Sequence, residues 1–275
     1  MRYISPAKIN LFLRVIERRP DNYHELASLF QTIDLCDTID ITLSNSDLLT
    51  CTDPTLPTDS SNLVMKAVNL FRQKTGLKFG VKAHLEKHIP HQAGLGGGSS
   101  NAATTLWALN QLCGYPATTE ELAAWSAEIG SDISFFFAQG TAYCTGRGEH
   151  VENLPSLPQT TLWIVKPSQG LSTPLVYQNL HPKELPQRQP KQMLQQFFNG
   201  TPYYFNDLEQ AAFSVMPALA TLKQKLTNVG FSSVVMTGSG SGFFCIGSKI
   251  PPVDATFFCR QVKFLNRETY NWYTQ

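Results

Sequence analysis

The feature that most constrains the fold is a glycine-rich segment at residues 90–103, with the sequence PHQAGLGGGSSNAA. An alternating apolar pattern over residues 79–85 predicts a half-buried strand before it. Apolar residues at helical spacing, ending near Gly114, predict a helix after it. Closely spaced glycines let backbone N–H groups approach a ligand, and the start of a helix adds free donors and a positive dipole end. The segment therefore predicts an anion site suited to phosphate groups.

Three other interpretations of this segment carry their own requirements. A Walker A loop needs Gly-Lys-Ser/Thr, but Gly98-Ser99-Ser100 contains no lysine, so this interpretation fails. A Rossmann fingerprint needs an acidic residue about 20 positions later at a strand end. The nearest candidate, Glu120, lies in the first turn of another predicted helix. The third interpretation is a plain turn in which a serine caps the following helix, and the combination of four glycines with two serines argues against it.

The rest of the chain mixes helices and strands without regular βαβ alternation. Residues 62–75 carry apolar side chains at helical spacing, and Gly76 is suited to the C-cap. Thr118 and Glu121 form the capping-box pattern of a helix that we expect to stop at Gly130. In the second half, the pattern predicts helices over 207–227 (around Pro217) and 254–265, and strands over 233–236 and 243–246. This order favours an α+β fold.

Length and loop composition indicate two domains. A chain of 275 residues allows two modest domains or one large one. Polar, proline-containing residues at 50–61 predict one loop. A second loop-like stretch, residues 181–201, carries three prolines that forbid a continuous helix. We place the boundary between residue 150 and this stretch, which divides the chain into residues 1–150 and residues 151–275.

Composition excludes several classes of protein. The 22 Lys and Arg against 21 Asp and Glu give a net charge of +1, which offers no electrostatic footprint for nucleic acid or an anionic membrane. No run approaches the roughly 18 apolar residues of a membrane-spanning helix. Asn10 and Arg14 interrupt the one stretch that resembles a signal peptide. The six cysteines are scattered without a C-x-x-C pair, which is typical of reduced thiols in a cytoplasmic protein. The charge gives no indication of a protein partner.

Three histidines imitate a metal site. His84, His88 and His91 have a spacing similar to that of zinc ligands. On an extended strand, however, residues four apart are separated by about 13 Å, which is too far to share one ion. A helix would bring them together, but the alternation over 79–85 and the proline at position 90 argue against one. The sequence therefore does not favour zinc.

The glycine-rich segment resembles the phosphate-binding motif of the small-molecule kinases grouped as galactokinase, homoserine kinase, mevalonate kinase and phosphomevalonate kinase (GHMP). Two further motifs of that superfamily match in order, SPAKINLFL at residues 5–13 and MTGSGSG at residues 236–242. DNYHEL at 21–26, LFQ at 29–31 and GSD at 130–132 are similar to one branch of the superfamily. That branch phosphorylates the 2-hydroxyl of a cytidine diphosphate derivative of methylerythritol, in the non-mevalonate route to isoprenoid precursors.

The resemblance implies a two-domain α+β kinase fold, with a mixed N-terminal domain, a smaller C-terminal α/β sandwich and the active site in the cleft between them. It implies ATP as the phosphoryl donor, together with Mg²⁺, whose ligands stay unassigned. The implied catalytic pair is Lys8 and Asp132. Asp132 would accept or orient the proton of the acceptor hydroxyl, and Lys8 would keep that carboxylate ionised and stabilise developing oxyanion charge.

The resemblance also implies two binding regions. In the acceptor site, Tyr23 and Tyr177 would stack on cytosine and His24 would read its edge. Further acceptor positions are Asn10 and Thr173, near the methylerythritol hydroxyls, and Phe30, which would line the pocket. The ATP site would comprise Asn62, Lys87, Pro90, His91, Gln92, Ala93, Gly94, Leu95, Gly96, Gly97, Gly98, Ser99 and Ser100.

Three alternative functions stay open at this point. The first is another kinase of the superfamily, acting on mevalonate or homoserine, and Tyr23, His24 and Tyr177 argue against it because such acceptors have no base to stack. The second is a non-catalytic nucleotide-binding regulator, which would need neither Lys8 nor Asp132. The third is a nicotinamide-dependent oxidoreductase, which a comparison of NAD binding with ATP binding would test.

Overall fold

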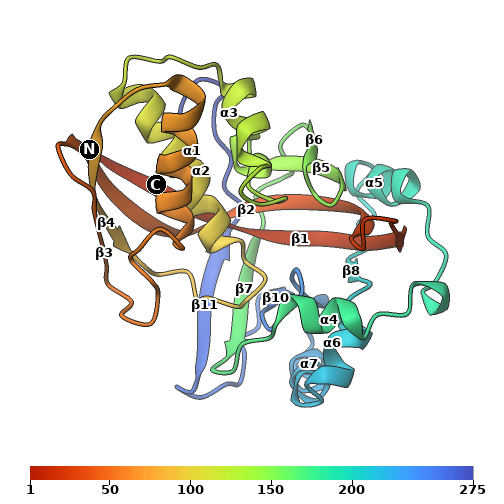
Figure 1. The fold of residues 1–275 in the computed structure, drawn as a ribbon. Coiled ribbons are helices and arrows are strands. Elements are labelled where there is room, and N and C mark those ends of the chain that lie inside the picture. The colour runs from red at the N-terminus through yellow and green to blue at the C-terminus, as the bar shows by residue number, and fades with distance from the viewer. Residues whose placement is uncertain (275) are drawn as a thin grey trace.

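The computed structural model describes residues 1–274 and contains two β-sheets, each with helices packed against it (Figure 1). The first sheet has seven strands. Five of them follow the order β3-β4-β2-β1-β8, while β5 lies beside β2 and carries β6 at its outer edge. The strands are β1 (Arg2–Arg18), β2 (His24–Ser44), β3 (Leu48–Cys51), β4 (Gly80–Glu86), β5 (Thr141–Gly146), β6 (His150–Asn153) and β8 (Phe205–Asn206).

The long antiparallel strands β1 and β2 are the framework of this sheet. Their register shifts between Pro6 and Ala7 and again between Asn10 and Phe12. Proline cannot donate to the strand ladder, and a bulge is a place where a strand tolerates it and re-aims its side chains. These irregularities flank the short stretch of β1 that carries Lys8.

Three helices cover one face of the first sheet: α1 (Leu63–Thr75), α2 (Gly97–Leu112) and α3 (Thr119–Ser126) (Figure 1). The predicted bounds of α1 are confirmed, because Asn62 caps its start and Gly76, with φ of 71°, ends it. The predicted capping box of α3 is present, although the helix ends at Ser126 rather than at Gly130. Helix α2 is buried on nearly all sides, since it packs between α1 and strands β1 and β2.

The second sheet has four strands in the order β11-β7-β10-β9. The predicted strands over 233–236 and 243–246 are confirmed, and so are helices on either side of Pro217. The helix after Pro217 packs Leu219, Leu222 and Leu226 against this sheet. The strands are β7 (Thr161–Pro167), β9 (Ser233–Met236), β10 (Phe243–Ile246) and β11 (Phe257–Lys263). The helices of this half are α4 (Thr173–Gln178), α5 (Pro190–Phe198), α6 (Glu209–Val215) and α7 (Ala218–Asn228), with a short 3-10 helix, η2 (Pro182–Glu184). A second 3-10 helix, η1 (Ser134–Phe137), packs against α2 and α3 in the first half.

The prediction of a helix over residues 254–265 is wrong. Residues 257–263 form β11, which pairs antiparallel with β7 from Phe257 opposite Pro167 to Lys263 opposite Thr161. A short apolar run fits helical and extended periodicity about equally well. Here the open edge of β7 offers a continuous row of backbone partners, and pairing along that edge decides in favour of the strand.

The loops and the chain end connect the two halves. In the stretch 181–201 no continuous helix forms, as expected, but α5 begins at Pro190, which is suited to the first turn of a helix. The second sheet begins at Thr161, and the division near residue 150 stays a prediction. After β11 the chain returns to the first half, where Trp272 stacks on Trp107 of α2. No helix within residues 1–274 is long and apolar enough to cross a membrane.

Candidate active site

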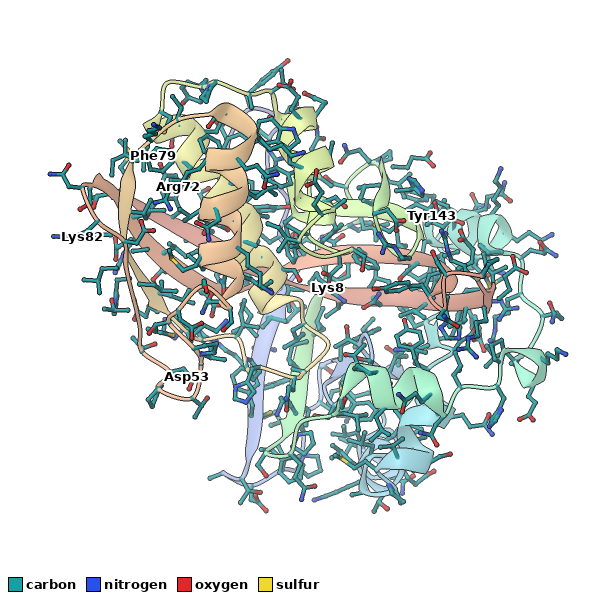
Figure 2. The ribbon with its side chains drawn as sticks, viewed as in Figure 1. Lys8, Asp53, Arg72, Phe79, Lys82 and Tyr143 are labelled. Atoms are coloured by element: carbon teal, nitrogen blue, oxygen red, sulfur yellow. The ribbon has the colours of Figure 1, made fainter. Side chains whose placement is uncertain are left out.

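A cavity of about 1340 Å³ opens between the helix-covered part of the first sheet and the second half of the chain. Lys8 of β1 lies near the centre of the molecule at this cavity (Figure 2). Of the residues that the sequence predicted for the site, Ser100 alone does not line it. The lining includes Lys8, Asn10, Tyr23, His24, Phe30, Asn62, Lys87, every residue from Pro90 to Ser99, Asp132, Thr173 and Tyr177.

The two glycine-rich loops pack directly on one another. Gly94 has φ of 72°, and a Cβ built on it would lie 1.9 Å from the carbonyl oxygen of Thr237. A Cβ on Gly238 would lie 2.9 Å from the Cα of Gly94. The hydroxyl of Thr237 donates to the carbonyl oxygen of Gly94 at 3.2 Å, which fixes the two backbones together. These glycines are required for the contact between the loops, and the contact brings Gly238, Ser239 and Gly240 into the cavity wall.

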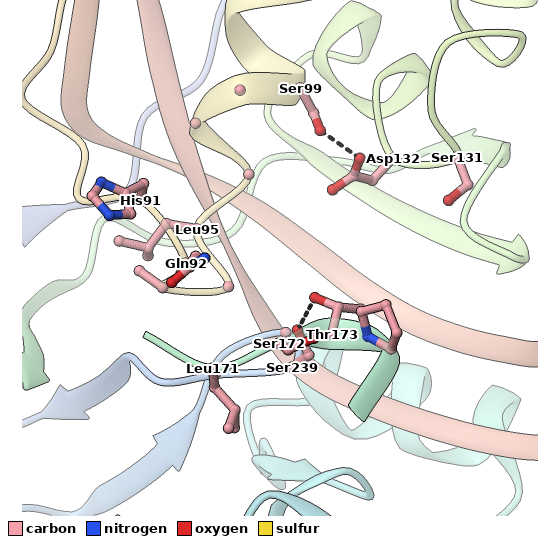
Figure 3. Close-up of a pocket in the computed structure, with 18 of the residues that line it drawn as sticks. His91, Gln92, Leu95, Ser99, Ser131, Asp132, Leu171, Ser172, Thr173 and Ser239 are labelled. Carbon is pink, nitrogen blue, oxygen red and sulfur yellow. Dashed lines mark hydrogen bonds between the residues drawn. The ribbon is translucent and has the colours of Figure 1, made fainter. Parts of the chain in front are cut away.

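The first turn of α2 is capped by a glycine. Gly96 occupies the N-cap with φ of 68°, and no side chain caps this helix, so the interpretation in which a serine caps it is wrong. Ser99 instead donates its hydroxyl to Oδ1 of Asp132 at 2.6 Å (Figure 3). The hydroxyl of Ser100 points away from the cavity and accepts a hydrogen bond from Ser5 at 2.9 Å. The N–H groups at a helix start have no partner within the helix, and the first three residues of α2 line the cavity, as an anion site would require.

Lys8 is a buried cation with a defined position. Its Nζ donates to Oδ1 of Asn10 at 2.7 Å and lies 4.7 Å from the centre of the Phe30 ring. Burial lowers the pKa of Lys8, while the nearby charge of Asp132 acts in the opposite direction. The two side chains share the cavity, yet they form no ion pair within 4.0 Å in the part of the chain that the structure describes.

Asn10 joins β1 to the second glycine-rich loop. Its side-chain oxygen also accepts a hydrogen bond from the N–H of Gly238 at 3.0 Å, and its Nδ2 donates to Ser28 at 2.9 Å. The backbone N–H of Asn10 donates to the hydroxyl of Thr237 at 3.1 Å. Most of the hydrogen-bonding capacity of this amide is therefore used inside the protein, and the amide holds Lys8 and the loop in one arrangement.

The end of the cavity beside the glycine-rich segment contains two predicted residues with partners in the protein. Asn62 accepts a hydrogen bond from the N–H of Val64 at 2.9 Å, so its side chain is also the N-cap of α1. Lys87 forms an ion pair with Asp37, a fully buried carboxylate of β2 that the sequence analysis missed. Nothing in the pattern around Asp37 marks it, because a lone acidic residue in a strand is ordinarily a solvated one.

The opposite end of the cavity is aromatic. The rings of His24 and Tyr177 stack with centroids 5.0 Å apart. Burial lowers the pKa of His24, with a smaller contribution from the positive charge of Arg18. Tyr23 is half exposed, and the guanidinium of Arg147 lies 4.8 Å from the centre of its ring. This end offers flat apolar faces beside polar edges, which suits a planar base.

The remaining acceptor candidates have mixed surroundings. The hydroxyls of Thr173 and Ser239 are 2.6 Å apart at the junction of α4 with the second glycine-rich loop (Figure 3). Phe30 lines the cavity and also packs edge-on against Phe135 in the core. The sequence analysis assigned no role to Ser131, Arg147 or Ser239, which the fold brings to the cavity.

The three histidines do not form a metal site. His84 contacts Thr50, while His88 lies 3.3 Å from Glu86 and His91 lies 3.5 Å from Asp53. Within residues 1–274 no group of three or more His, Cys, Asp or Glu side chains could hold a metal ion. His84 lies in β4, as the alternation over 79–85 predicted, and each of the three histidines has its own separate surroundings.

Comparison with known proteins identifies the class. The family model described as the GHMP kinases N terminal domain matches residues 62–140, which include the glycine-rich segment and Asp132. A crystal structure of homoserine kinase from Cytophaga hutchinsonii superposes with a TM-score of 0.70 at 16% identity, over 98% of this chain and 96% of that one, and so shares the fold. The fold is that of the GHMP class of small-molecule kinases.

Closer relatives define the family. The 4-diphosphocytidyl-2-C-methyl-D-erythritol kinase of Protochlamydia amoebophila (strain UWE25) is 54% identical over 276 residues, covering 100% of this chain and 93% of the relative. The chloroplastic enzyme of the same name from Oryza sativa subsp. japonica is 45% identical, covering 100% of this chain and 73% of the relative. A crystal structure of 4-(cytidine 5'-diphospho)-2C-methyl-D-erythritol kinase superposes with a TM-score of 0.82 at 33% identity, over 96% of this chain and 99% of that one. The chain belongs to the 4-diphosphocytidyl-2-C-methyl-D-erythritol kinase family.

Proposed function

We propose that this enzyme transfers the γ-phosphoryl group of ATP to the 2-hydroxyl of 4-diphosphocytidyl-2-C-methyl-D-erythritol. The single observation that best supports the proposal is the composition of one cavity. It contains a glycine-rich helix start at one end, the stacked His24–Tyr177 pair at the other, and Lys8 with Asp132 between them. A phosphate site and a base site separated by a carboxylate and a lysine match the two substrates of this reaction.

In the proposed mechanism, the first turn of α2 and Lys87 hold the triphosphate. Asp132 takes the proton of the 2-hydroxyl as the hydroxyl oxygen attacks the γ-phosphorus and the bond to the β–γ bridging oxygen breaks, which releases ADP. The hydrogen bond from Ser99 orients the Asp132 carboxylate for this task. Lys8, positioned by Asn10, stabilises the negative charge that develops on the reacting oxygens.

A divalent cation fits the oxygen donors of this site. Asp132 and Ser99 present a carboxylate and a hydroxyl to the cavity within 2.6 Å of one another. Mg²⁺ prefers such oxygen ligands and is commonly held by one or two carboxylates together with substrate phosphates. Ser99 would hold the ion through its hydroxyl oxygen together with substrate phosphates, and the ion would neutralise charge on the triphosphate while Asp132 stays available as the base.

At the acceptor end, we assign the cytosine to the aromatic group. Tyr23 and Tyr177 offer stacking faces, and His24, which burial keeps neutral at pH 7, offers one donor and one acceptor to the base edge. Asn10, Thr173 and Phe30 line the same cavity, and we assign Asn10 and Thr173 to the methylerythritol hydroxyls. An acceptor without a base, such as mevalonate or homoserine, would leave this end unused.

We also propose that the enzyme acts in the cytoplasm. All six cysteines lie within the described residues and are unpaired. Burial raises the pKa of Cys36 to about 12 and that of Cys245 to about 12, so these thiols stay protonated at neutral pH. Such inert, reduced thiols fit a reducing compartment.

The test measures ADP release from Mg²⁺-ATP in the presence of 4-diphosphocytidyl-2-C-methyl-D-erythritol, mevalonate or homoserine. We expect turnover with the cytidine compound only. Asp132→Asn keeps the shape of the side chain but removes the proton acceptor, and it should lower kcat by about 100-fold or more. Turnover with another acceptor would remove the cytosine assignment, and binding of ATP without turnover on any acceptor would favour a regulator.

A further inference from the structure

A buried carboxylate beside the glycine-rich segment, that of Asp37, does not line the cavity but has hydrogen-bond partners on both of its oxygens. Asp37 of β2 is fully buried, and both of its carboxylate oxygens are occupied. Oδ1 accepts hydrogen bonds from the backbone N–H groups of His88 at 2.7 Å and Ile89 at 2.8 Å. Oδ2 accepts from Nδ2 of Asn101 at 3.0 Å and pairs with the ammonium of Lys87.

These four partners lie at the two ends of one loop. His88 and Ile89 lie just before the glycine-rich segment, and Asn101 lies near the end of the segment, in the second turn of α2. One carboxylate therefore joins both ends of the loop to the long strand β2. A buried carboxylate is stable only when its lone pairs are satisfied, so the loop ends cannot separate from β2 without a large cost.

The same carboxylate determines where the Lys87 ammonium lies. An exposed lysine ordinarily extends its charged end into solvent, but the side chain of Lys87 is only 8% exposed. Its Nζ also donates to Oδ1 of Asn101 at 3.3 Å. A Cβ added to Gly97 would lie 3.3 Å from this Nζ, so the ammonium rests against the first turn of α2, where the free N–H groups face the cavity.

We propose that Asp37 is a positioning residue for nucleotide binding, which fixes the Lys87 ammonium against α2 and joins the two ends of the glycine-rich loop. The inference rests on the proposed function, since it takes the phosphates of ATP as the ligand of this loop. Asp37 acts through Lys87 and Asn101, both of which line the cavity. If Asp37 instead competed with phosphate for Lys87, removing the carboxylate would strengthen nucleotide binding. The two effects therefore predict opposite changes in affinity.

The experiment is a double-mutant cycle on the affinity for a non-hydrolysable ATP analogue with Mg²⁺, measured by calorimetry on the full chain. Asp37→Asn keeps the volume of the side chain but turns an amide N–H₂ toward the ammonium or Asn101. We expect this variant and Lys87→Met each to weaken binding on the order of tenfold. We expect the double variant to lose less affinity than the two single losses combined, because both changes remove the same positioned charge.

Kinetics separate positioning from a general loss of structure. In Asp37→Asn, the KM for ATP should rise about tenfold, while we expect the KM for the cytidine acceptor to stay within about twofold. The matched control is Asp207→Asn, a similarly buried carboxylate that pairs with Arg14 at 2.8 Å. We expect Asp207→Asn to lower the melting temperature without raising the KM for ATP relative to that for the acceptor.

Several results would overturn the proposal. One is an Asp37→Asn variant that binds the ATP analogue as tightly as the wild type or more tightly. Another is a double variant whose loss of affinity equals the two single losses combined. If Asp37→Asn does not fold, Lys87→Arg decides, because it keeps the charge but not its place; wild-type affinity in that variant would also overturn the proposal. A wild-type protein that binds the analogue but phosphorylates no acceptor would refute the proposed function alone. A wild-type protein that binds no nucleotide would refute both.

Discussion

The contact between the two glycine-rich loops can be tested with one methyl group. Gly94 and Gly76 both have a left-handed φ, of 72° and 71°. A Cβ on Gly76 meets nothing within 4 Å, whereas a Cβ on Gly94 meets the carbonyl oxygen of Thr237 at 1.9 Å. Replacing either glycine by alanine therefore imposes the same conformational penalty, and only Gly94→Ala also forces the loops apart.

The magnitudes follow from these two contributions. A left-handed alanine costs about 1 to 2 kcal/mol, so Gly76→Ala should lower the free energy of unfolding by about that amount and leave activity unchanged. In Gly94→Ala, the Cβ begins about 1.5 Å inside the ordinary contact distance of 3.4 Å, so one loop must move by more than an ångström. A displacement of about 1 Å at a site that aligns reacting groups costs roughly 100-fold in rate.

The assay compares urea unfolding and kcat/KM for ATP in the wild type and both variants. We expect Gly94→Ala to lose roughly 100-fold in kcat/KM and to be less stable than Gly76→Ala. Equal activity in the two variants would refute the argument, because it would show that the loop contact does not control the geometry of the site. An inactive Gly76→Ala variant would also refute it, since that glycine is far from any contact that a methyl group could disturb.

Two further predictions concern pH and the chain end. The lowered pKa of His24 favours the neutral ring in the folded state, so its contribution to the free energy of unfolding is fully present above pH 6.5 and falls as the pH drops below it. In urea unfolding between pH 7 and pH 5, His24→Gln should therefore lose less stability than the wild type. An unchanged pH dependence in this variant would contradict the assignment. Trp272 is buried against Trp107 and donates to the carbonyl oxygen of Ile4, so Trp272→Ala should lower the free energy of unfolding by about 3 kcal/mol. Tyr270→Ala, at a side chain that is 89% exposed, should change it by less than about 0.5 kcal/mol, and similar losses in both variants would contradict this packing role.

Local sequence determined those parts of the structure whose causes are local. Asn62 and Gly76 delimit α1, and Thr118 with Glu121 caps α3, because a cap needs only groups within one helical turn. Proline at position 217 separates α6 from α7 for the same reason. The glycine-rich segment was recognisable as an anion site since the donors of a helix start belong to consecutive residues.

The errors lie where a distant segment decides. Residues 257–263 carry no local signal against a helix, and the open edge of β7 makes them a strand. No role was assigned to Ser99 beyond the ATP site, yet its hydroxyl donates to Asp132, which is 33 residues away in the chain. The sequence order of these residues contains no information about such distances.

The sequence by itself therefore determined the type of chemistry: a phosphate loop, a lysine, a carboxylate and aromatic residues suited to a base. Only the tertiary structure decided which of these groups act together. Gly94 proved to be a loop contact, Asn10 a support for Lys8, and Asp37 the buried partner of Lys87. The physical reason is that hydrogen bonds and ion pairs depend on distances of a few ångströms, which the chain sets through packing between segments far apart in sequence.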